Sequence, residues 1–259
     1  MNSIRLPQSF IAAVTLAGAG ALVYASFVSL DLRDPGTLAL FALIAAVAQR
    51  QPVFLFRSSA ISVAFAATIA TYVLSGTGAA LLVNLASAAV NAFTPTRKPL
   101  AKIAFNTGSL TLSAFLAAET YRLVGGQTGP HDVLPTVLAV GASAAIYFLV
   151  SSSLTAAVIA LTSATEERFA QVWRQNYSWM IVNYLAVAVN GAALAFAYQT
   201  LAVFGALVFL IPLVVAWYSF KLYMVKSTEV RERNADLVEV NNRLLLANDR
   251  LEESHLSII

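Results

Sequence analysis

Asparagine side chains recur at a spacing of seven residues within the apolar segments of this chain. Asn84 and Asn91 form one such pair, and Asn183 and Asn190 form another. Seven residues make about two helical turns, so each pair lies on nearly one helix face. In lipid these amides act as glue between helices, or they line a ligand cavity. The second interpretation predicts a cavity made by amides and tyrosines, with Tyr198 close by: Asn84, Asn91, Asn106, Tyr147, Asn183, Tyr184 and Asn190.

Side chains for catalysis or metal binding are sparse. The chain has no cysteine and two histidines, His131 and His255, too few for a metal site. Nucleotide-binding, metallopeptidase and serine-hydrolase motifs do not occur in it. Glu119 is the one acid within the apolar segments, and Arg122 follows three residues later, so the two can pair on one helix face. We therefore predict that the chain itself is not an enzyme and binds no cofactor.

The composition predicts an integral membrane protein. Hydrophobic residues make up 59% of the 259 residues and charged residues 11%, against about 25% charged in soluble domains. Uncharged stretches near twenty residues match a hydrocarbon core of about 30 Å. The net charge of +3 comes from basic residues spread singly or in pairs between apolar runs. That distribution is typical of orientation signals, so we expect a lipid bilayer and no nucleic acid as partner.

The predicted fold is all-α, a polytopic transmembrane helix bundle with about eight spans. Gly76-Thr77-Gly78 marks a turn between two of them. Two spans are short, so six spans plus a re-entrant hairpin is the alternative. The spans run roughly over 10–30, 36–49, 58–75, 77–93, 101–124, 132–162, 177–198 and 200–223.

The basic residues predict the orientation. With the N-terminus inside, only Arg33 and Arg122 fall in outer loops. Because cytoplasmic loops carry an excess of Lys and Arg, we expect both termini to be cytoplasmic. The inner loops then hold Arg50, Arg57, Arg97, Lys98, Lys102, Arg168, Arg174, Lys221 and Lys226.

The last residues differ from the rest, which predicts a helical bundle over 1–224 and a cytoplasmic linker helix over 225–259. Leu237, Leu244 and Leu251 repeat every seven residues, and so do Asn234, Asn241 and Asn248. This heptad pattern predicts a parallel coiled-coil homodimer. Either the asparagines take the a positions and the leucines d, or the leucines take a with Val240 and Ala247 at d. An amphipathic helix on the membrane surface is the alternative, which the mixed charges disfavour.

Several segments resemble the multi-spanning N-terminal region of bacterial signalling proteins. They are AKIAFNTGSLTLSAFLAAETYRLVGG, YFLVSSSLTAAVIALTS, FAQVWRQNYSWM, WYSFKLY and the final NNRLLLANDRLEESHLSII. In those proteins a coiled-coil linker leads into an HD-GYP phosphodiesterase, a GGDEF cyclase, or a GAF or histidine-kinase module. The resemblance implies cyclic-di-GMP-type signalling, a bacterial inner membrane, and an output domain beyond Ile259. No GYP triplet or GGDEF motif occurs in the chain itself.

The sequence thus predicts a membrane sensor that binds an unknown small or lipophilic ligand and signals through the dimeric linker. A small rotation of the last span would exchange the two coiled-coil registers, which is a two-state switch. The alternative is a small-molecule transporter or substrate-capture subunit, favoured by the short spans at 36–49 and 77–93. The coiled coil disfavours that alternative, because transport does not need it.

Overall fold

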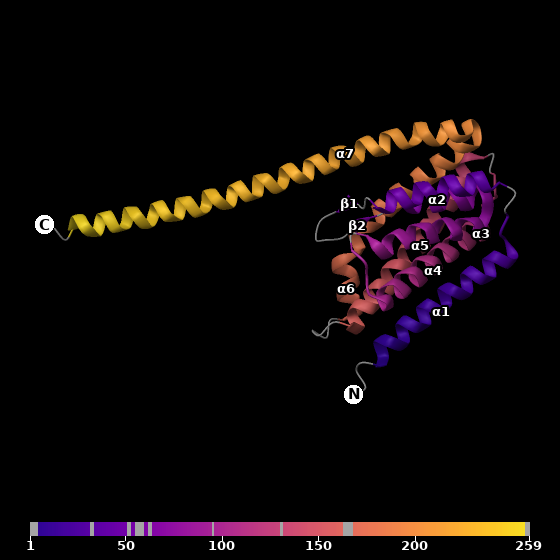
Figure 1. Ribbon diagram of the computed structural model, residues 1–259, viewed down its shortest axis with the longest axis horizontal. Coiled ribbons are helices and arrows are strands. Elements are labelled where there is room, and N and C mark those ends of the chain that lie inside the picture. The colour runs from indigo at the N-terminus through magenta and orange to yellow at the C-terminus, as the bar shows by residue number, and fades with distance from the viewer. Residues whose placement is uncertain are drawn as a thin grey trace. The chain divides into compact units, whose positions relative to one another are not determined.

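The computed structural model describes residues 5–31, 34–50, 53–54, 60–61, 64–94, 96–129, 132–162 and 168–256. It divides into two units, Met1–Phe209 and Leu210–Ile259. The first unit is a bundle in which α2 packs along α3, and α4 packs on α1, α3 and α5 (Figure 1). Its helices are α1 (Arg5–Val28), α2 (Pro35–Arg50), α3 (Ala64–Phe93), α4 (Leu100–Leu123), α5 (Val133–Thr162), α6 (Phe169–Asn176), a 3-10 turn (Ser178–Met180) and the start of α7 (Ile181–Leu256).

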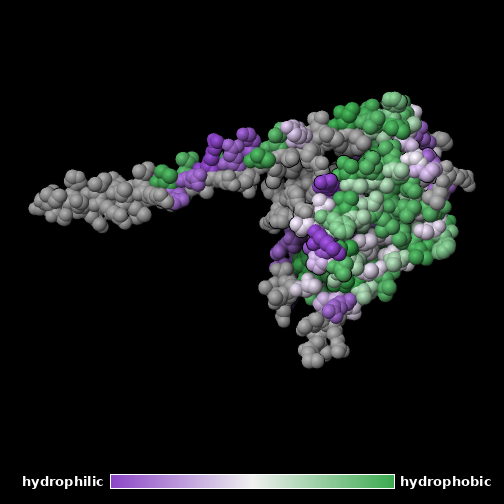
Figure 2. All heavy atoms as spheres, in the orientation of Figure 1, coloured by the Kyte–Doolittle hydropathy of each residue, from purple (hydrophilic) through white to green (hydrophobic). Residues whose placement is uncertain are grey.

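The chain is a membrane protein, because its long helices are apolar along their outer faces. Large side chains such as Phe27 (87% exposed) and Phe204 (76% exposed) are on the surface of the bundle, and apolar residues cover much of its visible face (Figure 2). An exposed apolar area this extensive indicates contact with lipid. In the described chain, five segments are long and apolar enough to cross a membrane: Pro7–Val28, Ala64–Phe93, Leu100–Leu123, Val133–Thr162 and Phe169–Val208. The count of eight spans stays a prediction.

The helix α3 consists of two antiparallel legs that meet at Gly76. Gly76 has φ 84° and ψ −179°, a conformation open essentially only to glycine. Thr77, just after it, contacts Glu119 near the end of α4, whereas Asn91 shares a cavity with Asn106 near the start of α4. The second leg therefore runs antiparallel to α4. The predicted boundary between 58–75 and 77–93 falls at this residue.

The helix α7 reverses direction in the same way at Ala202, which has φ 49° and ψ −134°. Beyond the reversal, Gly205 lies so close to the earlier leg that a Cβ there would be 1.9 Å from the Ala197 carbonyl oxygen. Only a residue without a side chain fits this approach. The boundary predicted between 198 and 200 therefore lies a few residues further along the chain.

Small residues let the helices of the first unit approach one another closely. A Cβ on Gly18 of α1 would be 2.4 Å from the carbonyl oxygen of Gly108 on α4. A Cβ on Gly191 of α7 would be 2.9 Å from the Ala66 carbonyl oxygen on the first leg of α3. Close backbone approach through glycine is how membrane helices gain packing energy where lipid supplies no hydrophobic drive. The Ala-rich composition thus produces a dense bundle.

A short β pair interrupts the otherwise all-α fold and corrects one predicted boundary. Val53–Phe54 (β1) pairs antiparallel with Ala60–Ile61 (β2), and helix α3 begins only at Ala64. The span predicted from residue 58 therefore starts too early, because β-branched residues such as Val53 and Ile61 fit a strand as well as an apolar span. Arg33 and Arg57 lie outside the described residues. Both were among the charges used to predict the orientation.

The second unit is the rest of α7, helical at every residue from Leu210 to Leu256. The described side chains of its heptad pattern are exposed, with Leu237 at 66% and Val240 at 53%. Asn234 and Asn241 are exposed as well. The side chains of Leu244, Asn248 and Leu251 lie outside the described ones. The predicted change from bundle to linker at 224/225 falls inside this helix and stays a prediction.

Candidate functional site: a polar cavity at the Lys98 end of the bundle

The two ends of the first unit differ in how their polar side chains are satisfied. The Gly76 end is where α3 reverses and α4 finishes. The Lys98 end is where the second leg of α3 finishes at Phe93 and α4 begins at Leu100. A cavity of about 330 Å³ opens at the Lys98 end between α3, α4, α5 and the segment that leads into α7. Its volume is at the lower end of the range of small-molecule pockets.

Polar side chains from three helices form one part of the cavity wall. They are Asn91, Asn106, Ser109, Ser151, Ser152 and Thr155. The hydroxyls of the α5 residues bond to carbonyls of their own helix, as Ser152 does to Phe148 at 2.6 Å. The Asn106 amide and the Ser109 hydroxyl, in contrast, make no hydrogen bond within the described chain. Since buried polar groups are normally paired, these two groups are available to a ligand or water.

Aromatic and apolar side chains form the rest of the wall: Leu110, Phe148, Tyr177, Met180 and Tyr184. The rings of Phe148 and Tyr184 lie 5.3 Å apart, and Trp173 lies behind Phe148 at 6.1 Å between ring centroids. The Trp173 indole N–H donates to Ser152 Oγ at 2.9 Å. This bond ties α6 to the cavity wall.

Lys98 does not line the cavity but is hydrogen bonded to a residue that does. The Lys98 ammonium group donates a hydrogen bond to Asn91 Oδ1, so only the Nδ2 donor of Asn91 remains for a ligand. Partial burial lowers the pKa of Lys98, and the positive charge of Lys102 lowers it further. The described lining contains no Asp or Glu. Lys98 therefore places a positive charge next to a described lining that has no carboxylate to balance it.

The structure brings three of the seven predicted cavity residues together. Asn91, Asn106 and Tyr184 line the cavity. Tyr147 lies one layer deeper, stacked on Phe65 at 3.7 Å and 5.9 Å from Tyr184 between ring centroids. It supports the wall without lining it.

The other three predicted residues lie outside the lining. Asn84 is buried, and its Nδ2 has no hydrogen-bond partner in the described chain. The Nδ2 of Asn190 donates to the Ala186 carbonyl of its own helix at 2.8 Å, so no second helix is needed to satisfy it. Asn183 is half-buried. Equal spacing along a helix therefore does not bring Asn183 and Asn190 into the cavity with Tyr184.

Sequence reasoning missed the hydroxyls and the apolar part of the wall. The Ser151-Ser152-Ser153 run followed by Thr155 in the middle of an apolar helix was the available signal, because hydroxyls at successive positions reach more than one helix face. Phe148 and Met180 carried no such signal, since an aromatic or a methionine in an apolar span is usually a core residue.

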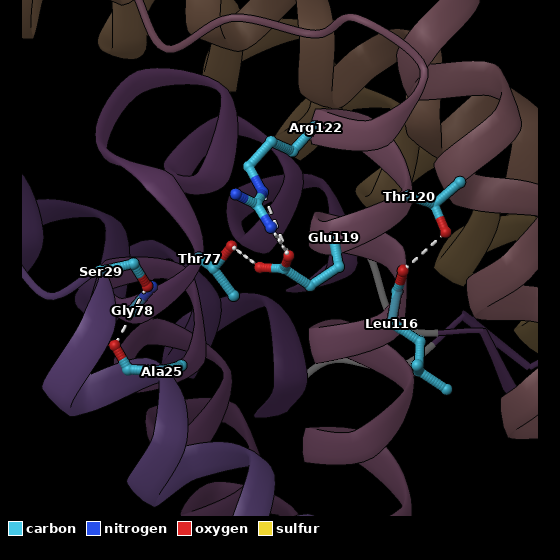
Figure 3. A network of polar contacts seen from close by, with 8 residues as sticks. All are labelled: Ala25, Ser29, Thr77, Gly78, Leu116, Glu119, Thr120 and Arg122. Carbon is cyan, nitrogen blue, oxygen red and sulfur yellow. Dashed lines mark hydrogen bonds and ion pairs between the residues drawn. The ribbon is translucent and has the colours of Figure 1, made fainter.

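At the Gly76 end the polar groups are paired with one another. Thr77 Oγ1 donates to Glu119 Oε1 at 2.9 Å, and the Arg122 guanidinium donates to Glu119 Oε2 at 2.7 Å (Figure 3). The pairing of Glu119 with Arg122 confirms the expectation from their spacing. The Gly78 N–H, left without an intrahelical acceptor by the reversal, donates to Ser29 Oγ at 3.0 Å. This end is closed by contacts from α1, α3 and α4.

The first leg of α7 contacts the same end of the bundle through Tyr198. Tyr198 and Thr37 are hydrogen bonded through their hydroxyls at 2.5 Å, and the Tyr198 ring meets Phe41 edge-on at 5.2 Å. The first leg of α7 thus extends from Tyr184 at the cavity to Tyr198 at the opposite end of the bundle.

These features define an α-helical membrane protein with a small polar cavity between its helices. The family follows from the sequence: the MASE9 family matches residues 11–223, more than four-fifths of the chain, so the chain belongs to MASE9, a family of membrane-associated sensory-type domains. No curated protein and no solved structure matches it. Within the described residues, no group of three His, Asp or Glu side chains is placed to hold a metal ion.

Proposed function

We propose that the chain is a membrane-embedded sensory module that transmits occupancy of its cavity through a dimeric coiled-coil linker to a cytoplasmic output domain. The observation that supports this proposal most directly is the continuity of α7. The family match ends at residue 223, and the helix continues through it to Leu256. A movement of the last leg in the membrane would therefore be carried into the linker, since a helix has no loop there to absorb it.

The cavity and the linker belong to the same helix. Tyr184, in the first leg of α7, lines the cavity, and this leg reverses at Ala202 into the one that becomes the linker. An occupant that displaces Tyr184 changes the packing of this leg. A ligand shifts a two-state equilibrium only through such differential contacts.

The heptad pattern favours a second copy of this chain as partner of the linker. Asn234 and Asn241 alternate with Leu237 along an exposed face, and asparagine at a positions pairs across a parallel dimer. The resemblance of the last residues to linkers that precede HD-GYP domains supports an output in cyclic-di-GMP-type signalling. The bacterial inner membrane with both termini in the cytoplasm is part of the same proposal.

Disulfide scanning tests the dimer and its register, because the chain has no native cysteine. Leu237→Cys should cross-link in membranes in either register, whereas Glu239→Cys, on the outer face in both, should not. Cross-linking of Asn241→Cys reports the register with asparagine at a, and cross-linking of Val240→Cys reports the register with leucine at a. If Glu239→Cys cross-links as well as Leu237→Cys, or if neither does, the coiled-coil linker is wrong.

A double substitution tests the two-state switch. Replacing Asn241 and Asn248 with leucine removes the cost of burying an amide at the a positions. We expect this background to reduce cross-linking of Val240→Cys relative to Leu237→Cys at least several-fold. An unchanged ratio would mean that the linker does not exchange between the two registers.

A further inference from the structure

We infer that the cavity at the Lys98 end binds a small organic anion, a molecule with an acidic head group on an apolar body. This deepens the proposed sensory function by naming the ligand class of its cavity. The acidic head has two possible sources, a soluble organic acid or the head group of an anionic lipid, and the experiment below separates them.

The donors of the cavity wall select for negative charge. Asn91 Nδ2, the Asn106 amide and the Ser109 hydroxyl can all donate to a ligand, and the Lys98 ammonium group is one hydrogen bond behind Asn91. A bound cation would meet this lysine with no carboxylate in the described lining to compensate. Hydrogen bonds from such donors to an ionised acceptor are roughly twice as strong as neutral ones.

The apolar part of the wall favours a ligand with an apolar group attached to its acidic head group. Phe148, Tyr184 and Met180 contribute two aromatic rings and a polarisable sulfur to the lining, which suit a compact apolar group. The cavity has a volume of about 330 Å³. A compact molecule such as an aromatic acid fits this space, and a long acyl chain would have to extend out of it.

The environment of Lys98, which bonds to the lining residue Asn91, agrees with this inference. Its pKa is lowered by burial and by the charge of Lys102, so its charged form is disfavoured there. An anion beside Asn91 would offset both effects, because a nearby negative charge favours the charged form of Lys98. The cation thus contributes to binding more than an exposed lysine does.

Binding can be measured on the full chain in nanodiscs of phosphatidylcholine by tryptophan fluorescence. Trp173 donates to the lining residue Ser152, so an occupant should change its emission. The probes are phenylacetate, phenyl phosphate, the neutral phenylacetamide and the cationic phenethylamine. We expect saturable binding of an acid, and binding of the amide and the amine weaker by about tenfold or more. Equal affinity for acid and amide would overturn the inference.

Two matched pairs of variants localise the binding to this cavity. Lys98→Gln should weaken binding of the acid by about tenfold, whereas Lys102→Gln, exposed on α4, should have a much smaller effect. Asn106→Leu should also weaken it, whereas Asn183→Leu, the same change outside the lining, should leave it intact. Equal effects within either pair would contradict the site. A thermal unfolding curve of each variant without probe shows whether it is folded.

A second arm distinguishes the two sources of the anion. In nanodiscs that contain phosphatidylglycerol, a lipid head group in the cavity should produce the same emission change without a probe and should block phenylacetate. Binding of phenylacetate unaffected by phosphatidylglycerol identifies a soluble acid. If neither the acids nor phosphatidylglycerol change the emission, the cavity does not bind anions. That failure leaves the dimeric linker untouched, since disulfide scanning tests it without any ligand.

Discussion

The polar side chains at the Gly76 end of the bundle are hydrogen bonded to one another, whereas some at the Lys98 end have no partner in the described chain. At the Gly76 end, Thr77, Glu119 and Arg122 bond to one another, and Ser29 satisfies the N–H that the reversal leaves free. At the Lys98 end, the Asn106 amide and the Ser109 hydroxyl face a cavity without a partner in the described chain. At one end the protein itself supplies the hydrogen-bond partners, and at the other end a ligand or water can supply them.

This difference separates the part of a sensor that must hold still from the part that must respond. A fully paired polar network fixes its helices, because breaking any bond leaves a buried group unsatisfied. An incompletely paired network forms its missing hydrogen bonds only when a ligand or water enters the cavity. The first leg of α7 reaches both ends, through Tyr184 and Tyr198. Under the proposed function, it would tilt at the Lys98 end while its contacts at the Gly76 end hold it.

The largest expected effect comes from separating the helices of the closed end. A Cβ at Gly78 would be 2.8 Å from the Leu30 backbone and 3.0 Å from the Ala25 carbonyl oxygen, and backbone atoms cannot move aside as a side chain can. Gly78→Val should therefore cost about 3 kcal/mol or more, seen as loss of monodisperse protein in size-exclusion chromatography.

The matched control for this change is Gly20→Val on α1, where a Cβ meets no atom within 4 Å. Its thermal midpoint should stay close to that of the native protein. If both variants are equally stable, α1 and α3 do not contact each other at this end as described.

Removing the acid at the centre of the closed end comes next. Glu119→Ala leaves Thr77 and Arg122 without their acceptor, which should lower stability by about 2 kcal/mol. Arg122→Ala should cost less than about 1 kcal/mol, because the Arg122 side chain is 69% exposed whereas that of Glu119 is 20% exposed. Thermal unfolding in detergent measures both changes, and a larger loss for Arg122→Ala would contradict the network.

Two buried serines compare the two kinds of polar environment with one substitution. Ser143, fully buried, is hydrogen bonded to the Tyr72 hydroxyl at 2.6 Å, whereas Ser109 faces the cavity with no partner in the described chain. Ser143→Ala should cost about 1 kcal/mol, and Ser109→Ala should cost almost nothing. If chemical denaturation finds equal losses, the Ser109 hydroxyl is not free.

The smallest effect is a pH dependence at the start of α2. Asp34 accepts hydrogen bonds from the side chain and the backbone N–H of Thr37, and these bonds lower its pKa below 3.8. Its ionised form therefore stabilises the fold above pH 3.8, and this contribution is lost as the pH falls through the lowered pKa. The thermal midpoint of the native protein should approach that of Asp34→Asn as the pH falls below 4, and a constant difference would contradict this role.

The sequence predicted the helices well, because the signals are local. Apolar runs of fixed length, glycine turns and the Glu119–Arg122 spacing each depend on a few neighbouring residues, and α2, α4 and α5 begin and end within one or two residues of their predicted bounds. The β pair before α3 was missed, because its residues are as apolar as those of a span. Of the seven residues predicted for a ligand cavity, Asn91, Asn106 and Tyr184 line the cavity, whereas Asn190 bonds within its own helix. Ligand binding by these residues stays a prediction.

The sequence by itself determined that this chain is a helical bundle in a membrane, since the hydropathy of each residue does not depend on its neighbours in the tertiary structure. It also set the heptad pattern of the linker. Only the tertiary structure decided which end of the bundle is closed and which is open. That depends on the reversals at Gly76 and Ala202, which bring residues from distant helices together, and no spacing along one helix records which neighbour will face it.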